Sequence, residues 1–265
     1  MDGVTIGVDV GGTTVAAGLV GPDGAVLEHV QAPTHRDGAG TALDTILALL
    51  DRLREAARAR GVAIAGVGVG IPGTVDAERG VVGVDVHNAP ELAHVPLAER
   101  LGARVGAPVY VDNDVNALAL AEWTWGAGRG ARSLVMLALG TGVGGGIVLD
   151  GRLHRGAAGF GGELGHVPIA FDGPPCICGG RGGLKAYVSG PDIARRAGAR
   201  LGRPVAADEV FRLAATGDAD AGAIVEETCR ALGAGLAIIV NGLNPERLLL
   251  AGSVAKSLRP LEARI

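Results

Sequence analysis

The chain has few cysteines and no long apolar run, and each shortage excludes a class of protein. Only three of its 265 residues are cysteines, two of them in Cys176-Ile177-Cys178, so a framework of disulfides is not expected. A membrane-spanning helix needs about 18 consecutive apolar residues, and the sequence contains no such run. The first predicted strand begins by Val4, which leaves no room for a signal peptide. We therefore expect a cytoplasmic protein with no membrane partner.

Basic clusters are missing as well. The 24 lysines and arginines are outnumbered by 28 acidic residues, which gives a net charge of −4, and no basic run stands out. Nucleic acid is therefore not an expected partner. Hydrophobic residues make up 48% and charged residues 20% of the chain, as is typical of a globular protein with one large or two small domains.

Neither of two common nucleotide-binding motifs is complete in this sequence. No lysine follows a glycine at the spacing of a Walker A loop. Residues 68–73 and 140–145 match the pattern G-x-G-x-x-G, but the first match continues into a Pro-Gly turn and the second into another apolar run. A dinucleotide-binding fingerprint needs a strand, a turn and then a helix, so a Rossmann fold is not indicated.

The chain does contain two runs of strand-forming residues that stop abruptly in glycine and threonine. They are VDVGGTT at residues 8–14 and LGTGVGGG at residues 139–146, and each leads through a further apolar run to an Asp-Gly turn. A glycine-rich turn lets backbone N–H groups point at a phosphate that a Cβ would block. The pair therefore favours a clamp for nucleotide phosphates over loops that merely join strands. Asp9, at the end of the first strand, is placed to hold Mg²⁺, usually through water.

Strands and helices alternate along the chain. We expect strands near residues 4–10, 15–20, 25–31, 64–71, 108–111, 133–139, 146–149 and 247–251. We expect helices near residues 42–60, 92–105, 115–125, 191–201, 207–216 and 221–243, the first capped by Thr41. The alternation, with its repeated hairpins, predicts an α/β fold of two related lobes, residues 1–111 and 112–265.

Two polar segments are candidates for a binding site. Asp112-Asn113-Asp114 follows a predicted strand, at the edge where α/β proteins bind ligands, although Asp and Asn are also preferred helix caps. Glu163 and His166 stand three residues apart in a segment dense in glycine, which favours a polar pocket, whereas a lone histidine is usually structural.

Six segments together resemble the ROK family (repressor, open reading frame, kinase), and in particular its glucokinase-like branch. They are DVGGT at 9–13, NDVN at 113–116, GTGVGGG at 140–146, GELGH at 162–166, CICGGRG at 176–182 and NGLNP at 241–245. The resemblance implies a two-lobed actin-like ATPase fold, related to ribonuclease H, with sugar and nucleotide bound in the cleft between the lobes. It also implies a homodimer.

The resemblance implies a sugar kinase that transfers the γ-phosphate of ATP to a hexose hydroxyl, the 6-hydroxyl of a glucose-like sugar. Asp114 would be the general base, and other sugar hydroxyls would be bound by Asn113, Glu163 and His166. The transferred phosphate and Mg²⁺ would lie against Asp9, Gly11, Gly12 and Thr13, and the inner phosphates against Gly140, Thr141 and Gly142. Some relatives use polyphosphate as the donor, so the resemblance leaves both ATP and polyphosphate open.

The sequence departs from the family pattern at its zinc motif, Cys-x-Cys-Gly-x-x-Gly-Cys-x-Glu. The last cysteine position holds Gly183. A structural zinc takes four ligands, and three are supplied by His166, Cys176 and Cys178, with water or Asp172 as candidate fourth ligand. We therefore expect zinc to be absent or weakly held.

Two further departures concern the substrates. The glutamate position of the motif holds Lys185, which would face the sugar but can only donate hydrogen bonds, so an acidic or differently substituted sugar would be tolerated. The glycine run expected at the nucleotide appears as Ala251-Gly252-Ser253, with Gly252 as the nucleotide contact. Family members typically continue through a further strand and helix, so we expect the chain to be short at this end. The alternative function is a catalytically weakened sugar-binding or sensing protein without a DNA-binding domain.

Overall fold

The computed structural model describes residues 3–35, 41–84, 86 and 89–265. The described residues form two compact units. The first runs to Gly126 and includes Arg155–Phe160, and the second consists of Ala127–His154 and Gly161–Ile265. Each unit has its own sheet and helices, which confirms the predicted α/β class. No helix in the described part of the chain is long and apolar enough to cross a membrane.

The sheet of the first unit has the strand order β3-β2-β1-β4-β7. Its strands are β1 (Val4–Val10), β2 (Thr14–Val20), β3 (Val26–Pro33), β4 (Ile64–Ile71) and β7 (Val109–Asn113). β2 pairs antiparallel with β1 and β3, whereas β1, β4 and β7 are parallel. The carboxyl ends of these three strands therefore meet at one edge of the sheet, where α/β proteins bind ligands.

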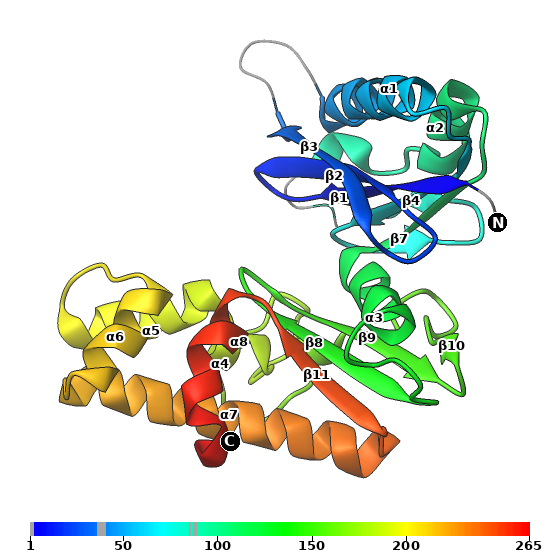
Figure 1. Ribbon diagram of the computed structural model, residues 1–265. Coiled ribbons are helices and arrows are strands. Elements are labelled where there is room, and N and C mark those ends of the chain that lie inside the picture. The colour runs from blue at the N-terminus through cyan, green and yellow to red at the C-terminus, as the bar shows by residue number, and fades with distance from the viewer. Residues whose placement is uncertain (1–2, 36–40, 85, 87–88) are drawn as a thin grey trace. The chain divides into compact units, whose positions relative to one another are not determined.

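Three helices complete this unit, α1 (Ala42–Ala59), α2 (Leu97–Val105) and α3 (Asp114–Thr124), together with the 3-10 turn η1 (Pro90–Leu92) and a small hairpin of β5 (Val75–Asp76) and β6 (Val81–Val82). α1 and α2 lie on one face of the sheet and α3 on the other (Figure 1). Thr41 caps α1 as predicted. Its hydroxyl accepts a hydrogen bond from the backbone of Asp44, whose carboxylate accepts one from the backbone of Thr41.

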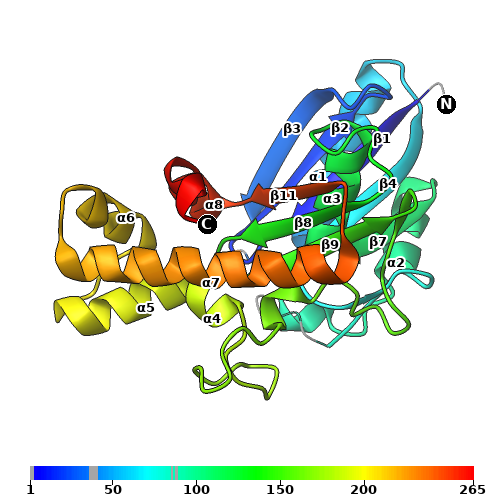
Figure 2. The same ribbon diagram turned by 90° about the horizontal axis from the view of Figure 1, so that it is seen from below.

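The second unit has a sheet of order β10-β9-β8-β11. Its strands are β8 (Leu134–Leu139), β9 (Val143–Leu149), β10 (Arg152–Leu153) and β11 (Arg247–Ala251). Its helices are α4 (Lys185–Val188), α5 (Gly190–Leu201), α6 (Ala207–Ala215), α7 (Ala219–Leu243) and α8 (Ser253–Leu258), with 3-10 turns η2 (Leu164–His166) and η3 (Arg259–Arg264). Figure 2 shows α7 as the long helix against which α5 and α6 pack.

Three predicted boundaries differ from those observed by three residues or more. The helix expected at 92–105 begins at Leu97, because His94 adopts a left-handed conformation that interrupts it. The strand expected at 146–149 begins at Val143, because glycines 144–146 pair with β8 as part of the strand. The compact units differ from the predicted lobes 1–111 and 112–265, because α3 packs against β4 and β7 and so belongs to the first unit.

Candidate active site

Asp9 and Asp112 stand in one row across the parallel strands of the first unit. Asp9 of β1 is opposite Gly70 of β4, and Gly70 is opposite Asp112 of β7. A Cβ on Gly70 would lie 3.3 Å from the Cα of Asp114, so a glycine here allows α3 to begin close to the sheet. The sheet thereby brings Asp9 and the Asp112–Asp114 segment to the same edge.

Asn113 serves as the N-cap of α3. Its Oδ1 accepts hydrogen bonds from the backbone N–H groups of Val115 and Asn116, over 2.9 and 3.2 Å, and its amide donates to the carbonyl of Gly73 over 3.1 Å. The capping function that the sequence left open for the whole segment therefore belongs to Asn113. Asp114 follows as the first residue of the helix, where its Oδ1 accepts a hydrogen bond from the backbone of Val115 over 2.9 Å.

The electrostatic setting makes Asp114 a stronger base than an ordinary aspartate. Burial is the main cause that raises the pKa of its carboxyl, and the negative charge of Asp9 raises it further, against hydrogen bonds from Val115 and Asn113. Burial also raises the pKa of Asp9. A carboxylate with a raised pKa holds a transferred proton more firmly, as general-base chemistry requires.

The first glycine loop, residues 11–13, is held by a residue that the sequence analysis missed. Thr34 is fully buried; its hydroxyl donates to the carbonyl of Gly11 over 2.7 Å and its backbone N–H donates to the carbonyl of Thr13 over 2.9 Å. Gly11 itself is needed because a Cβ there would lie 2.7 Å from the carbonyl oxygen of Thr14. Thr34 thus supplies hydrogen bonds to two carbonyl oxygens of the loop that would otherwise repel a phosphate.

The second loop, Gly140 to Gly142, forms the tip of the β8–β9 hairpin in the second unit. Gly140 donates to the carbonyl of Gly142 over 3.0 Å and accepts from the N–H of Gly190, at the start of α5, over 2.8 Å. A Cβ on Gly140 or Gly142 would meet no atom within 4 Å. Packing within the protein therefore does not require glycine at these two positions. Because no protein atom lies beside them, a ligand can approach the backbone of the loop.

A cavity of about 290 Å³ lies beside this loop, lined by Gly140, Thr141, Gly190, Pro191, Ala207, Asp208, Phe211, Ser253, Val254 and Ser257. Gly252 precedes two of the lining residues and has a φ of 96°. A Cβ on Gly252 would lie 2.3 Å from the carbonyl oxygen of Leu139. Only glycine therefore fits at this position, where the chain passes close to the end of β8. The residues that follow, Ser253 and Val254, line the cavity.

His166 is shared between the predicted sugar and metal sites. Its Nε2 lies 3.7 Å from a carboxylate oxygen of Glu163, and its Nδ1 lies 3.0 Å from the Sγ of Cys176. One ring can therefore serve both predicted roles, because each role uses a different nitrogen. The Sγ atoms of Cys176 and Cys178 lie 3.1 Å apart.

Among the described residues, His166, Cys176 and Cys178 form the group that could hold a metal ion, and Asp172 does not belong to it. The donor atoms, one imidazole nitrogen and two sulfurs, suit zinc but make up three of its four usual ligands. Gly183 faces the group, since a Cβ there would lie 3.3 Å from the Sγ of Cys176. The residues present therefore fit zinc incompletely, as the sequence predicts.

Lys185 begins α4 and lies near the same group. Burial raises the pKa of the Cys176 thiol, and the positive charge of Lys185 is among the influences that oppose this. The positive charge of Lys185 therefore lies in the same region of the second unit as Cys176 and its neighbours His166 and Glu163.

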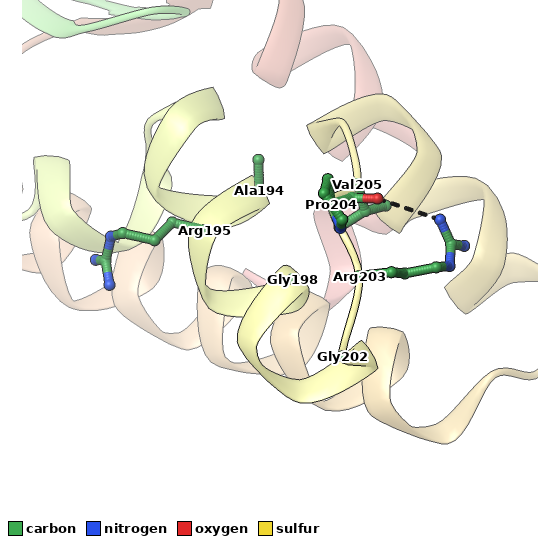
Figure 3. Close-up of a pocket in the computed structure, with 7 residues that line it drawn as sticks. All are labelled: Ala194, Arg195, Gly198, Gly202, Arg203, Pro204 and Val205. Carbon is green, nitrogen blue, oxygen red and sulfur yellow. Dashed lines mark hydrogen bonds between the residues drawn. The ribbon is translucent and has the colours of Figure 1, made fainter.

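A broader depression of about 500 Å³ lies between the end of α5 and the segment that leads to α6 (Figure 3). Its two arginines point away from it: Arg195 pairs with Asp192 over 3.2 Å and Arg203 with Glu209 over 2.8 Å. The depression contains none of the predicted site residues.

Residues 5–264 match the ROK family. The chain belongs to this family. It is 38% identical to the glucokinase of Thermotoga maritima over 271 residues, which are 95% of this chain and 82% of that protein.

Solved structures of ROK family proteins are also similar to this chain. The chain is similar to a ROK hexokinase from Thermus thermophilus, with 37% identity, a TM-score of 0.85 and coverage of 98% of this chain and 88% of that one. It is also similar to a ROK family glucokinase from Streptomyces griseus in complex with glucose and AMPPNP, with 32% identity, a TM-score of 0.79 and coverage of 99% and 88%. The predicted actin-like ATPase and sugar kinase fold is thereby confirmed.

Proposed function

We propose that this chain is an ATP-dependent hexose kinase in which Asp114 is the general base. The observation that carries the proposal is the setting of Asp114, at the first position of α3 with a carboxyl pKa that burial and the charge of Asp9 raise. The family membership and the glucokinase and hexokinase relatives support the same activity.

Phosphoryl transfer depends on positioning and on neutralising charge more than on covalent help from the protein. In the proposed reaction a hexose hydroxyl, the 6-hydroxyl of a glucose-like sugar, attacks the γ-phosphorus of ATP as Asp114 takes the hydroxyl proton. The bond from the γ-phosphorus to the β–γ bridging oxygen breaks, and ADP leaves. Asn113, Glu163 and His166 bind other hydroxyls of the sugar. Amide, carboxylate and imidazole groups suit this task because sugar hydroxyls both donate and accept hydrogen bonds.

The residues near the first glycine loop fit a magnesium ion. Asp9 offers carboxylate oxygens, which Mg²⁺ prefers, and its charge already acts on the carboxyl of Asp114. Asp9 would hold the ion through water, beside the backbone of Gly11, Gly12 and Thr13. When bound, Mg²⁺ neutralises phosphate charge during transfer.

Nucleotide binding is assigned to the second unit. The backbone of Gly140, Thr141 and Gly142 receives the inner phosphates, and the cavity of about 290 Å³ beside it receives the rest of the nucleotide. Ser253 and Val254 line that cavity because of the turn at Gly252. The homodimer that the resemblance implies is part of the proposal, and sedimentation of the full chain tests it.

The experiment that tests the function is a screen for sugar-dependent ADP release. Purified protein with ATP and Mg²⁺ is offered hexoses, N-acetylhexosamines and uronic acids, and a parallel assay measures sugar phosphate formed with polyphosphate as donor. We expect ADP release with at least one neutral hexose. Sugar binding without phosphorylation of any sugar by either donor would overturn the kinase assignment in favour of a sensing protein.

A further inference from the structure

Arg155 stands where the chain leaves the second unit for six residues. β10 and His154 belong to the second unit, Arg155–Phe160 to the first, and the chain is back in the second unit from Gly161. No motif of the sequence analysis includes Arg155, and its side chain is nevertheless attached directly to the segment that contains Asp114.

The attachment is an ion pair between Arg155 and Asp112. Both Nε and Nη2 of Arg155 donate to Oδ2 of Asp112, over 2.8 and 2.6 Å. The side chain of Asp112 is only 18% exposed, so the pair is partly withdrawn from water, where charge-assisted hydrogen bonds are stronger than at a free surface.

The other oxygen of Asp112 is bound to the start of α3. Its Oδ1 accepts from the backbone N–H of Asn113 over 2.8 Å and from the side-chain amide of Asn116 over 3.0 Å. Asn116 is buried and lies in the first turn of α3, two residues after Asp114. Asp112 therefore joins Arg155 to residues on both sides of Asp114.

We infer that Arg155 is a positioning residue for phosphoryl transfer. Through Asp112 it fixes the first turn of α3, and its guanidinium neutralises the charge of a carboxylate two residues from Asp114. Asp112 is thereby a structural acid, and Asp114 remains the carboxylate that receives the proton. This inference rests on the proposed function of Asp114.

We expect the pKa of Asp114 to shift in opposite directions in two single variants. Arg155→Met keeps the aliphatic stem and leaves the charge of Asp112 unpaired, which raises the pKa of Asp114. Asp112→Asn leaves the guanidinium of Arg155 unpaired, which lowers it. The double variant removes both charges and returns the pKa toward its original value.

The measurement is the pH profile of kcat/KM for the hexose, whose acid limb reports the ionisation of the free enzyme's base. We expect the limb to move to higher pH by about half a unit or more in Arg155→Met, to lower pH in Asp112→Asn, and back in the double variant, as for a neighbouring charge. We also expect kcat to fall about tenfold in Arg155→Met, and less in Arg155→Lys, since the base is less firmly placed.

Arg104 provides a matched control. It donates through Nε and Nη2 to the two oxygens of Asp51, over 3.0 and 2.5 Å, in a pair between α2 and α1 that is more exposed. Arg104→Met should leave the pH profile and kcat unchanged. If Arg155→Met does not fold, Arg155→Lys and Asp112→Asn still carry the test.

Two outcomes separate this inference from the proposed function. Acid limbs that stay in place in both single variants, or that move in the same direction, would overturn the positioning role while Asp114→Asn remains inactive. Full turnover by Asp114→Asn would overturn the assignment of the base itself.

Discussion

The hydroxyl of Thr34 donates a hydrogen bond to the carbonyl oxygen of Gly11 over 2.7 Å, from a side chain that is fully buried. The backbone N–H of Thr34 holds the neighbouring carbonyl of Thr13. The residue after β3 therefore sets the shape of the first glycine loop, and the loop's suitability for a phosphate depends on a contact that lies outside it.

Replacing Thr34 with valine keeps its shape and its backbone contact but removes the hydroxyl. Gly11 then has a partly buried carbonyl without its donor, which costs about 1 kcal/mol or somewhat more. We expect a lower free energy of unfolding in urea and a raised KM for ATP. Thr34→Ser, which keeps the hydroxyl, should stay close to the original protein in both measurements, and an unchanged KM for ATP in Thr34→Val would show that the contact does not shape the loop.

Asp114→Asn separates the base function from capping and shape. Asparagine can still accept the hydrogen bond from Val115 but cannot take a proton, and loss of a general base typically costs about 10²–10⁴ in rate. We expect kcat to fall by that amount while calorimetry shows sugar affinity within a few-fold. Because Asn113 already caps α3, a helix-capping explanation predicts no loss of activity, and undiminished turnover would support it.

The same substitution should stabilise the fold at neutral pH. The pKa of Asp114 is higher in the folded protein than its ordinary value of 3.8, so the folded state binds its proton more tightly than the unfolded chain. Ionisation therefore destabilises the fold as pH rises through the folded-state pKa. Asp114→Asn removes this cost, and denaturant midpoints should exceed those of the original protein at pH 7, with the difference shrinking as pH falls toward 4. A constant difference at all pH values would show that ionisation of Asp114 is not its cause.

Zinc should be sub-stoichiometric or readily lost to a chelator in the original protein, because His166, Cys176 and Cys178 supply three ligands. Gly183→Cys should raise zinc occupancy, since the new Cβ faces the Sγ of Cys176. Elemental analysis of protein purified without added metal measures the zinc content of the original protein and of the variant. Gly222→Cys adds a thiol on α7 where a Cβ meets no atom within 4 Å, and should bind no additional zinc. One tightly held zinc per original chain would contradict the prediction.

The elements that could be predicted from sequence are those with local signals. The cap and the buried apolar residues of α1 lie within one segment, and β7 begins in a short apolar run that follows a glycine and a proline. The contacts of Thr34 and Arg155 could not be predicted, because their partners lie 23 and 43 residues away and follow from strand register and from the path of the chain.

The glycines of residues 140–146 also have different roles that the sequence alone does not distinguish. Gly140 and Gly142 lie in open space at a loop, whereas a Cβ on Gly145 would lie 2.4 Å from the carbonyl oxygen of Gly162. The sequence presents all three as one glycine-rich run. Only the pairing of β9 with β8 and the approach of residue 162 separate the glycines of the loop from those of the strand.

Lys185 provides the sharpest test of substrate choice. Its charge acts on Cys176, in the group that shares His166 with Glu163. If the ammonium faces the sugar, Lys185→Glu restores acceptors for hydroxyls. Hydrogen bonds to a charged group are worth roughly 1.5–3 kcal/mol, so kcat/KM for glucose should rise about tenfold or more.

Lys185→Met separates the two effects of that change, because it removes the charge without adding an acceptor. We expect it to improve turnover of glucose less than Lys185→Glu does. Any activity on uronic acids should fall in both variants, since a carboxylate on the sugar loses its cationic partner. The comparison requires kcat/KM for glucose and for one uronic acid in all three proteins. If neither variant changes kcat/KM for any neutral hexose, Lys185 does not contact the sugar, and the pocket must supply its acceptors from other residues.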